Sequence, residues 1–169
     1  EVNAMKKLLF TTTLIFSFAL QPLVAMADGA VRFSNNAFKQ VIKEDASGSK
    51  AFDYVEPGLV IPGDVIMYEV GFENISDKPI TNIVINNPIP NNSAYRQGSA
   101  TAKDYDVTFS VDGKDFKAAD KLVVKDKQGK TWLAKPEQYS HIRWVYKNTL
   151  QPGEKKTVTY KTVIKKATE

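Results

Sequence analysis

Apolar and polar residues alternate in several short stretches of this chain, and this period of two restricts its fold more than any other feature. In Val65–Phe72 every second residue from Ile66 onward is apolar, and Tyr105–Val111, His141–Lys147 and Thr157–Lys165 largely follow the same rule. Side chains in a β-strand point to opposite faces in turn, so each stretch predicts a half-buried strand. No comparably long stretch after residue 27 follows the period of an amphipathic helix.

Turn-forming residues divide the rest of the sequence into further short strands. Asp112-Gly113 directly follows an alternating stretch and is typical of a hairpin turn, with Phe116 at the start of the return strand. Asp126–Gly129 predicts a second turn, and the proline-containing segment Asn86–Ser93 predicts a loop. The remaining expected strands are Ala37–Ile42, Ala51–Val55, Ile80–Ile85, Leu122–Val124 and Lys130–Ala134.

These elements predict an all-β fold. A parallel sheet would need crossover helices, and the sequence offers none, so the sheets should be antiparallel. Many short strands separated by turns are typical of a sandwich, and we expect an immunoglobulin-like antiparallel β-sandwich of roughly seven to nine strands. The chain has no cysteine, so no disulfide can support this domain and its apolar core has to stabilise it alone.

The N-terminus has the pattern of a secretory signal peptide. Two lysines follow Met5, the apolar stretch Leu8–Leu20 comes next, and Ala25-Met26-Ala27 supplies small residues for a signal peptidase. Leu8–Leu20 is shorter than the about 20 apolar residues of a transmembrane helix, which makes a retained membrane anchor the weaker alternative. We therefore expect residues 1–27 to be removed, with residues 1–4 upstream of the initiator. Export would lead to the periplasm, the extracellular space or the cell surface, with no stable membrane anchor after cleavage.

The residues after the signal peptide are expected to form one domain. Residues 28–56 would supply an N-terminal extension and the first strands, and residues 57–169 would form the sandwich core. The net charge is only +4, and the lysines are spread along the chain rather than gathered in a basic stripe. Nucleic-acid-binding proteins usually carry such a stripe, so we expect no nucleic-acid partner.

Parts of the sequence carry a pattern more specific than strand alternation. Ile61–Asn74 contains Pro-Gly-Asp followed by spaced Tyr, Val and Asn residues, Asn87–Ser99 contains Asn-Pro-Ile-Pro, and Trp144–Tyr160 contains Leu-Gln-Pro-Gly-Glu before the last strand. Together these segments resemble the conserved repeat domain of bacterial and archaeal surface proteins, which is called domain of unknown function eleven. The resemblance covers about residues 57–164, in a single copy. It implies a β-sandwich that serves as a building block, often in tandem, of large surface proteins.

The sequence offers few groups for catalysis. His141 is the only histidine and lies on the strand face opposite to Ile142 and Trp144, so we expect it to point outward. A serine triad needs a base and an acid that meet it in space, and a zinc site needs several histidine or cysteine ligands. We therefore expect no catalytic residue, no enzymatic activity and no cofactor.

A group of aspartates is the remaining candidate for a metal site. Asp104, Asp106, Asp112 and Asp115 are close in sequence, and calcium prefers carboxylate and carbonyl oxygens. Their spacing does not match an EF-hand loop, and the hairpin turn explains Asp112 better. They are therefore weak calcium candidates.

The first functional hypothesis is a structural or assembly role at the cell surface, in a fibre or in an extracellular matrix. The resemblance supports it, and so does an apolar segment ahead of the core. The apolar residues of this segment are Val31, Phe33, Phe38, Val41 and Ile42. The segment can pair with its own sandwich as a first strand, or add to the open edge of a neighbour by strand addition. The partner is then a second copy or another surface or envelope protein.

The second hypothesis is a secreted or periplasmic binding module that recognises a glycan, a peptide or an envelope protein through its end loops. Asn86–Gly98 and Asp126–Tyr139 would carry the contacts, as loops on rigid scaffolds often do. Tyr95, Trp132 and Tyr139 lie in or near these loops and are candidate contact residues. Partial burial at the rim of the sandwich is the alternative for these rings.

Overall fold

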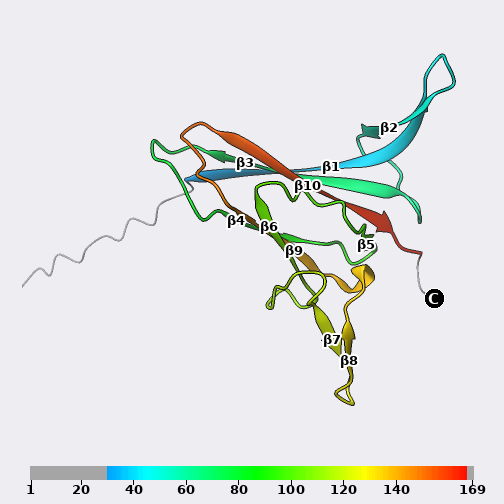
Figure 1. Ribbon diagram of the computed structural model, residues 1–169. Coiled ribbons are helices and arrows are strands. Elements are labelled where there is room, and N and C mark those ends of the chain that lie inside the picture. Colours follow the sequence, from blue (N-terminus) through cyan, green and yellow to red (C-terminus); the bar gives the residue numbers. More distant parts are fainter. Residues whose placement is uncertain (1–29, 167–169) are drawn as a thin grey trace, which may run out of the picture.

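Ten β-strands and one short 3₁₀ helix form the regular structure of residues 30–166, the part of the chain that the computed structural model describes (Figure 1). The strands are β1 (Val31–Glu44), β2 (Lys50–Val55), β3 (Val65–Asn74), β4 (Val84–Pro88), β5 (Ser93–Tyr95), β6 (Tyr105–Ser110), β7 (Val123–Lys125), β8 (Thr131–Leu133), β9 (His141–Tyr146) and β10 (Lys155–Ile164), and the helix is η1 (Pro136–Gln138). All strand pairings are antiparallel, in sheets of five, three and two strands. The prediction of an all-β sandwich is confirmed, with slightly more strands than expected.

Two sequence predictions concern the N-terminus and membrane insertion. The predicted signal peptide, residues 1–27, lies outside the described residues. Within residues 30–166, no helix is long and apolar enough to cross a membrane. The strand β1, which begins at Val31, belongs to the five-stranded sheet because it pairs with β3.

The five-stranded sheet has the order β2-β1-β3-β10-β5. Its inner face confirms the alternation that predicted β3 and β10, since Val70, Phe72, Val158 and Tyr160 are all buried there. Tyr68 stacks on Tyr160, with ring centroids 5.0 Å apart. Aromatic pairs of this kind add stability beyond the apolar area that they bury, so this pair strengthens the contact between β3 and β10.

The three-stranded sheet has the order β4-β9-β6 and covers the inner face of the larger sheet. In its central strand Ile142 and Trp144 are fully buried, as the alternation predicted. The Trp144 ring lies 5.9 Å from the Tyr160 ring of the other sheet, measured between centroids. Its indole N–H donates a hydrogen bond to the carbonyl oxygen of Thr101, at 3.0 Å. Trp144 therefore joins the two sheets and satisfies its polar atom at the same time.

The sequence misplaced the strand in the segment that follows β3. The expected strand Ile80–Ile85 is instead β4, shifted toward the C-terminus to Val84–Pro88, while Ile80 makes only an isolated bridge with Leu150. The expected loop Asn86–Ser93 therefore overlaps β4, and β5 begins at its last residue. A proline fits in β4 because this strand lies at the edge of its sheet, where one side needs no ladder hydrogen bond.

The return strand expected from Phe116 does not form. Beyond the Asp112-Gly113 turn, only Lys117 pairs, in an isolated bridge with Phe109. Phe116 instead places its ring under the Arg143 guanidinium, 3.6 Å from the ring centroid. A cation over an aromatic ring is a favourable contact, so this segment is held to β9 by a side chain and not by a ladder of backbone hydrogen bonds.

The turn predicted at Asp126–Gly129 is confirmed and joins β7 to β8. The Asp126 carboxylate accepts the backbone N–H groups of Gln128 and Lys130, both at 2.9 Å, which closes this turn. The two strands form a separate arm that projects from the sandwich in Figure 1.

β1 is longer than the sequence suggested and takes part in two pairings in succession. Residues Val31–Lys39 pair with β3, and residues Lys39–Glu44 pair with β2. The second half of β1 and β2 thus form a hairpin that projects beyond the sandwich (Figure 1). At the base of this hairpin the Lys161 ammonium contacts the Tyr54 hydroxyl and lies 3.4 Å from the Gln40 amide oxygen, which ties the hairpin to β10.

Asn74 ends β3 and is a fully buried polar residue. Its amide nitrogen donates to the carbonyl oxygens of Lys78 and Leu150, at 2.7 and 2.9 Å, and its amide oxygen accepts the N–H and hydroxyl of Ser76. Asn74→Ala would remove all four bonds and leave the Ser76 N–H without its acceptor, so we expect the free energy of unfolding in urea to fall by about 2–3 kcal/mol. Ser76→Ala removes only hydroxyl bonds and should cost less than about 1 kcal/mol. Equal losses in the two variants would contradict this role of Asn74.

Candidate functional site

His141 points away from the core, on the outer face of the three-stranded sheet. Its Nδ1 atom lies 2.9 Å from the hydroxyl oxygen of Ser140, and that oxygen also lies 3.2 Å from the carbonyl oxygen of Ser110. The imidazole packs against Gly113, where an added Cβ would come within 2.8 Å of the ring. Gly113 has a φ of +76°, so glycine is required there both for the turn and for the ring.

The Ser140–His141 pair lacks the rest of a catalytic arrangement. A nucleophilic serine needs a base that is itself oriented by an acid. The partners found for the Ser140 hydroxyl are the Ser110 carbonyl and the adjacent imidazole, and no hydrogen bond joins a carboxylate to His141 among residues 30–166. The pair therefore holds the 110–113 turn against β9.

The aspartates considered for calcium do not come together. Asp104 and Asp106 lie at the start of β6, while Asp112 and Asp115 lie beyond its end, roughly 20 Å away at the rise of an extended strand. Asp106 instead forms an ion pair with Lys147, at 2.6 Å. Within residues 30–166, no group of three or more His, Cys, Asp or Glu side chains is arranged to hold a metal ion.

Asp112 closes the turn after β6. Its carboxylate accepts the backbone N–H of Lys114 at 2.8 Å, the Ser110 hydroxyl at 2.8 Å and the backbone N–H of Asp115 at 3.1 Å. These donors, led by the Lys114 N–H, favour the charged carboxylate and lower the pKa of Asp112 to about 2. The carboxylate is thus engaged as a turn cap, which confirms the turn interpretation of this residue.

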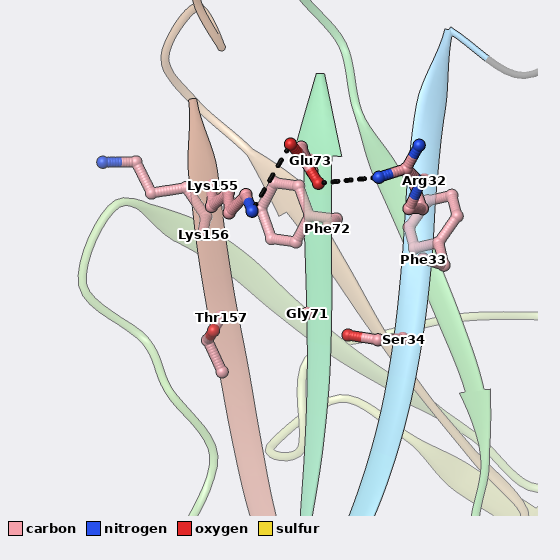
Figure 2. Close-up of a pocket in the computed structure, with 9 residues that line it drawn as sticks. All are labelled: Arg32, Phe33, Ser34, Gly71, Phe72, Glu73, Lys155, Lys156 and Thr157. Carbon is pink, nitrogen blue, oxygen red and sulfur yellow. Dashed lines mark hydrogen bonds and ion pairs between the residues drawn. The ribbon is translucent and has the colours of Figure 1, made fainter. Parts of the chain in front are cut away.

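A shallow depression of about 250 Å³ lies on the outer face of the five-stranded sheet (Figure 2). Gly71 forms its floor, between Ser34 and Thr157 on the neighbouring strands. At one end the Glu73 carboxylate lies between Arg32 and Lys155, at 3.4 and 3.5 Å. Lys156 also lines the depression, so its charged groups are mainly cationic at this end, and the part along β1 and β3 is formed by the small residues Ser34 and Gly71.

The structure divides the aromatic residues that were expected to make loop contacts. Tyr95 and Tyr139 are both buried and pack on Phe109, with each ring centroid 4.8 Å from that of Phe109. These two tyrosines are therefore not exposed loop contacts, and the alternative of burial holds for them, since Tyr95 lies in β5 and Tyr139 directly follows η1. Trp132 lies on the β7–β8 arm and is 40% exposed.

The two loop regions expected to carry contacts do meet in space. Gln97 of the first and Leu133, Pro136 and Tyr139 of the second line a hollow of about 380 Å³ at the base of the β7–β8 arm. Asp120 and Lys135 also line it, so its charged groups are of opposite sign. The hollow is open and largely apolar, as small-ligand and peptide sites often are.

The β1–β2 hairpin and the segment after it expose large apolar side chains. Ile42 and Phe52 lie directly opposite each other on the two strands and are 68% and 62% exposed. Leu59 and Ile61, which follow the hairpin, are also exposed. Single exposed apolar residues are common on soluble proteins, but a group of them on one projecting element is typical of an interaction surface.

The first half of β1 has an open edge. Residues Val31–Phe38 pair with β3 on one side, while β2 covers the other side only from Lys39 onward. Among residues 30–166, no backbone group of this stretch bonds to another segment on that other side. Unpaired edge groups of this kind are a template for an added strand.

The residues proposed for strand addition all lie in β1, and their side chains divide between the two faces of the sheet. Val31 and Phe33 share the inner face with Phe72 and Val70, and Phe38 lies on the outer face. Val41 and Ile42 lie in the hairpin, where they are opposite Asp53 and Phe52 of β2. Phe33 is nevertheless 49% exposed, in a groove that it lines with residues of β4.

Sequence analysis missed Phe52 and Leu59 as surface residues. Phe52 belongs to an expected strand, and apolar residues in strands usually face the core. Ile42 and Phe52 belong to different strands, and the sequence does not give the register between them. Only the pairing of β1 with β2 shows that the two side chains lie side by side. A tip of mixed charge around Glu44 and Lys50 was the available signal of an exposed hairpin.

Comparisons with known proteins give this chain no relative. No protein-family model matches it, and no curated protein or solved structure matches it either. Its function therefore has to be inferred from the surfaces described above.

Proposed function

We propose that this chain is an exported, non-catalytic assembly domain of the cell surface, of a fibre or of an extracellular matrix. Its partner is a second copy or another surface or envelope protein. The observation that carries the proposal is the continuous strand β1, which combines an open edge with a projecting apolar hairpin.

These two features favour protein contacts over small-molecule binding. The open edge offers backbone hydrogen bonds, and the hairpin offers apolar area next to it, which is the combination used in strand addition. The depression on the outer sheet face is shallow, and its one carboxylate, Glu73, is already paired with Arg32 and Lys155, so it adds no ligand site of comparable strength. The turn contacts of His141 and Asp112 support a role without catalysis.

Two sequence features support the place of action. The signal-peptide pattern of residues 1–27 supports export, and the resemblance to the conserved repeat domain supports a surface role. Export and the surface role are therefore both parts of the proposed function. An intact mass of the exported protein that begins at Asp28 would agree with cleavage after Ala27, and a mass that retains the leader would contradict it.

The assembly is tested by the mass of the exported protein over a wide concentration range, measured by light scattering with negative-stain images of the same samples. We expect oligomers or ordered polymers for the wild type. The double variant Ile42→Ser and Phe52→Ser should shift assembly to about tenfold or higher concentration, since each loses the burial of a large apolar side chain.

A matched control uses the other projecting element. Trp132 and Leu133 on the β7–β8 arm are 40% and 55% exposed, so Trp132→Ser with Leu133→Ser removes a similar apolar area. We expect this variant to assemble as the wild type does. A wild type that stays monomeric at every concentration would contradict the proposed function.

A binding module is the second candidate, and the hollow at the base of the β7–β8 arm favours it. This hollow brings both predicted contact loops together around Leu133 and Tyr139. Its largely apolar lining suits a peptide with an apolar side chain or the apolar face of a sugar ring. A strictly monomeric protein whose saturable binding to an envelope peptide or glycan is lost in Leu133→Asp would favour this candidate.

A further inference from the structure

We propose that the open edge of β1 pairs antiparallel with the same edge of a second copy, about a two-fold axis at Ser34. This inference deepens the proposed assembly function and rests on it.

The direction of each backbone group on β1 follows from its neighbours. The N–H of Ile75 donates to the carbonyl oxygen of Ala30 at 3.0 Å, while Asn74 bonds on the opposite side, to Gly153 and Glu154. Backbone groups in a strand alternate in direction, so the even-numbered residues of β1 bond to β3. The odd-numbered residues from Val31 to Ala37 therefore direct their N–H and C=O groups toward the open edge.

This edge is complementary to itself. In an antiparallel pair centred on Ser34, Val31 lies opposite Ala37 of the second copy and Phe33 lies opposite Asn35. Both are hydrogen-bonded pairs, so every outward N–H and C=O from residue 31 to residue 37 gains a partner. β2 occupies the same side of β1 from Lys39 onward, so the free stretch ends where this register ends. An isologous contact needs such a self-matching surface.

Side chains in this register are compatible as well. Arg32 is the only charged residue in Val31–Phe38, and it lies opposite Asn36 of the second copy. Asn36 donates to the Glu69 carboxylate at 3.2 Å, so Arg32 approaches a neutral amide beside an acid and meets no like charge. On the outer face the axis passes Ser34 beside Gly71, where the small residues of the depression in Figure 2 keep the surface flat.

The inner face gains apolar contact. Phe33 is 49% exposed and lines a groove of about 230 Å³ with Val84 and Ile85 of the smaller sheet. Opposite Asn35 of the second copy, it lies diagonal to the Phe33 ring of that copy, a distance of about 7–8 Å that aromatic rings can bridge. The pairing therefore covers the ring that the fold leaves open.

The other edge strands of the five-stranded and three-stranded sheets carry features that hinder pairing. β4 ends in Pro88, β5 has only three residues, and the outer side of β6 is occupied at Phe109 by the bridge to Lys117. β2 carries Lys50 and Asp53. Prolines, charges and short length are the usual means of blocking edge pairing, and residues 31–38 have no proline and a single charge.

The two-fold arrangement also leaves room for growth. Antiparallel pairing sends the two β1–β2 hairpins to opposite ends of the dimer, so Ile42 and Phe52 stay available for a second contact. Replacing these apolar residues should then stop growth at the dimer and leave the β1 contact intact.

A single introduced thiol tests the register, because the chain has no cysteine. In the proposed pair the two Ser34 residues face each other at a Cα–Cα distance of about 4.5 Å, within the roughly 4.4–6.8 Å of disulfides. We expect most of exported Ser34→Cys to become a covalent dimer under mild oxidation, seen on a non-reducing gel. Asn36→Cys is the matched control. Its two thiols would be about 13 Å apart in the proposed pair, so this variant should run as a monomer on the same gel.

A second variant tests the edge without a thiol. Asn35→Pro removes an N–H that points outward, so it should keep the monomer fold and abolish dimerisation in light scattering. Oligomers that persist in Asn35→Pro would contradict this pairing but not the assembly function. The same holds for oligomers of Ser34→Cys that do not form a disulfide. A monomeric wild type would overturn both. Equal cross-linking of the two cysteine variants would indicate random collision and would also overturn the pairing.

Discussion

Replacing Trp144 with alanine is expected to lower the free energy of unfolding by about 3–5 kcal/mol. The side chain is fully buried in the centre of β9 and packs against Tyr160 of the opposite sheet. Its loss opens a cavity between the sheets and leaves the Thr101 carbonyl oxygen without its indole donor. Folded domains of this size are stable by only about 5–15 kcal/mol, so the variant would lose a large share of the total.

The second tryptophan supplies the control. Trp132 is 40% exposed on the β7–β8 arm, so Trp132→Ala should cost less than about 1 kcal/mol. Urea unfolding of both variants, followed by circular dichroism, measures the difference directly. The thermal midpoint of Trp144→Ala should fall by about 10 °C or more. Equal losses of unfolding free energy in Trp144→Ala and Trp132→Ala would contradict the role of Trp144 as a core contact between the two sheets.

The sequence predicted those strands whose inner faces are regular. In β3, β9 and β10 every second side chain meets the opposite sheet, so local alternation and final burial agree, as at Val70, Ile142 and Val158. In β4 this agreement fails. Ile83 and Ile85 are both buried, yet the ladder with β9 begins at Val84 and runs through Pro88. The position of a partner strand decided that boundary, and local alternation carries no information about it.

The candidate site depends even more on distant contacts. Sequence patterning identified an apolar segment at Val31–Ile42 but not its pairing, and the open edge exists only because β2 begins to cover β1 at Lys39. Two aromatic residues that were expected at the surface are buried, and this too depends on distant contacts. Tyr95 and Tyr139 stand among turn residues, and they are buried because β5 pairs with the end of β10 and brings both rings onto Phe109.

Raising the pH from 10 to about 12 is expected to unfold this domain, because its core contains several tyrosines. Burial raises the pKa of each of the following residues above its ordinary value: Tyr68, Tyr95, Tyr105, Tyr139 and Tyr160. For Tyr105, removal of the ring from water raises the pKa to about 12. Charged tyrosinate is favoured in the unfolded chain, where the pKa is near 10, so unfolding releases protons at high pH.

The sign of the effect follows from this difference. A tyrosine with a raised pKa in the folded state contributes its full stability below about pH 10, and that contribution is lost as the pH rises toward about 12. We expect tyrosinate absorbance to appear together with the loss of β-sheet circular dichroism, in one cooperative transition. Tyr105→Phe removes one of these ionisations and should move the alkaline midpoint upward while leaving stability at neutral pH nearly unchanged. Gradual ionisation from pH 10 with an intact sheet signal would show that water already reaches the core tyrosines.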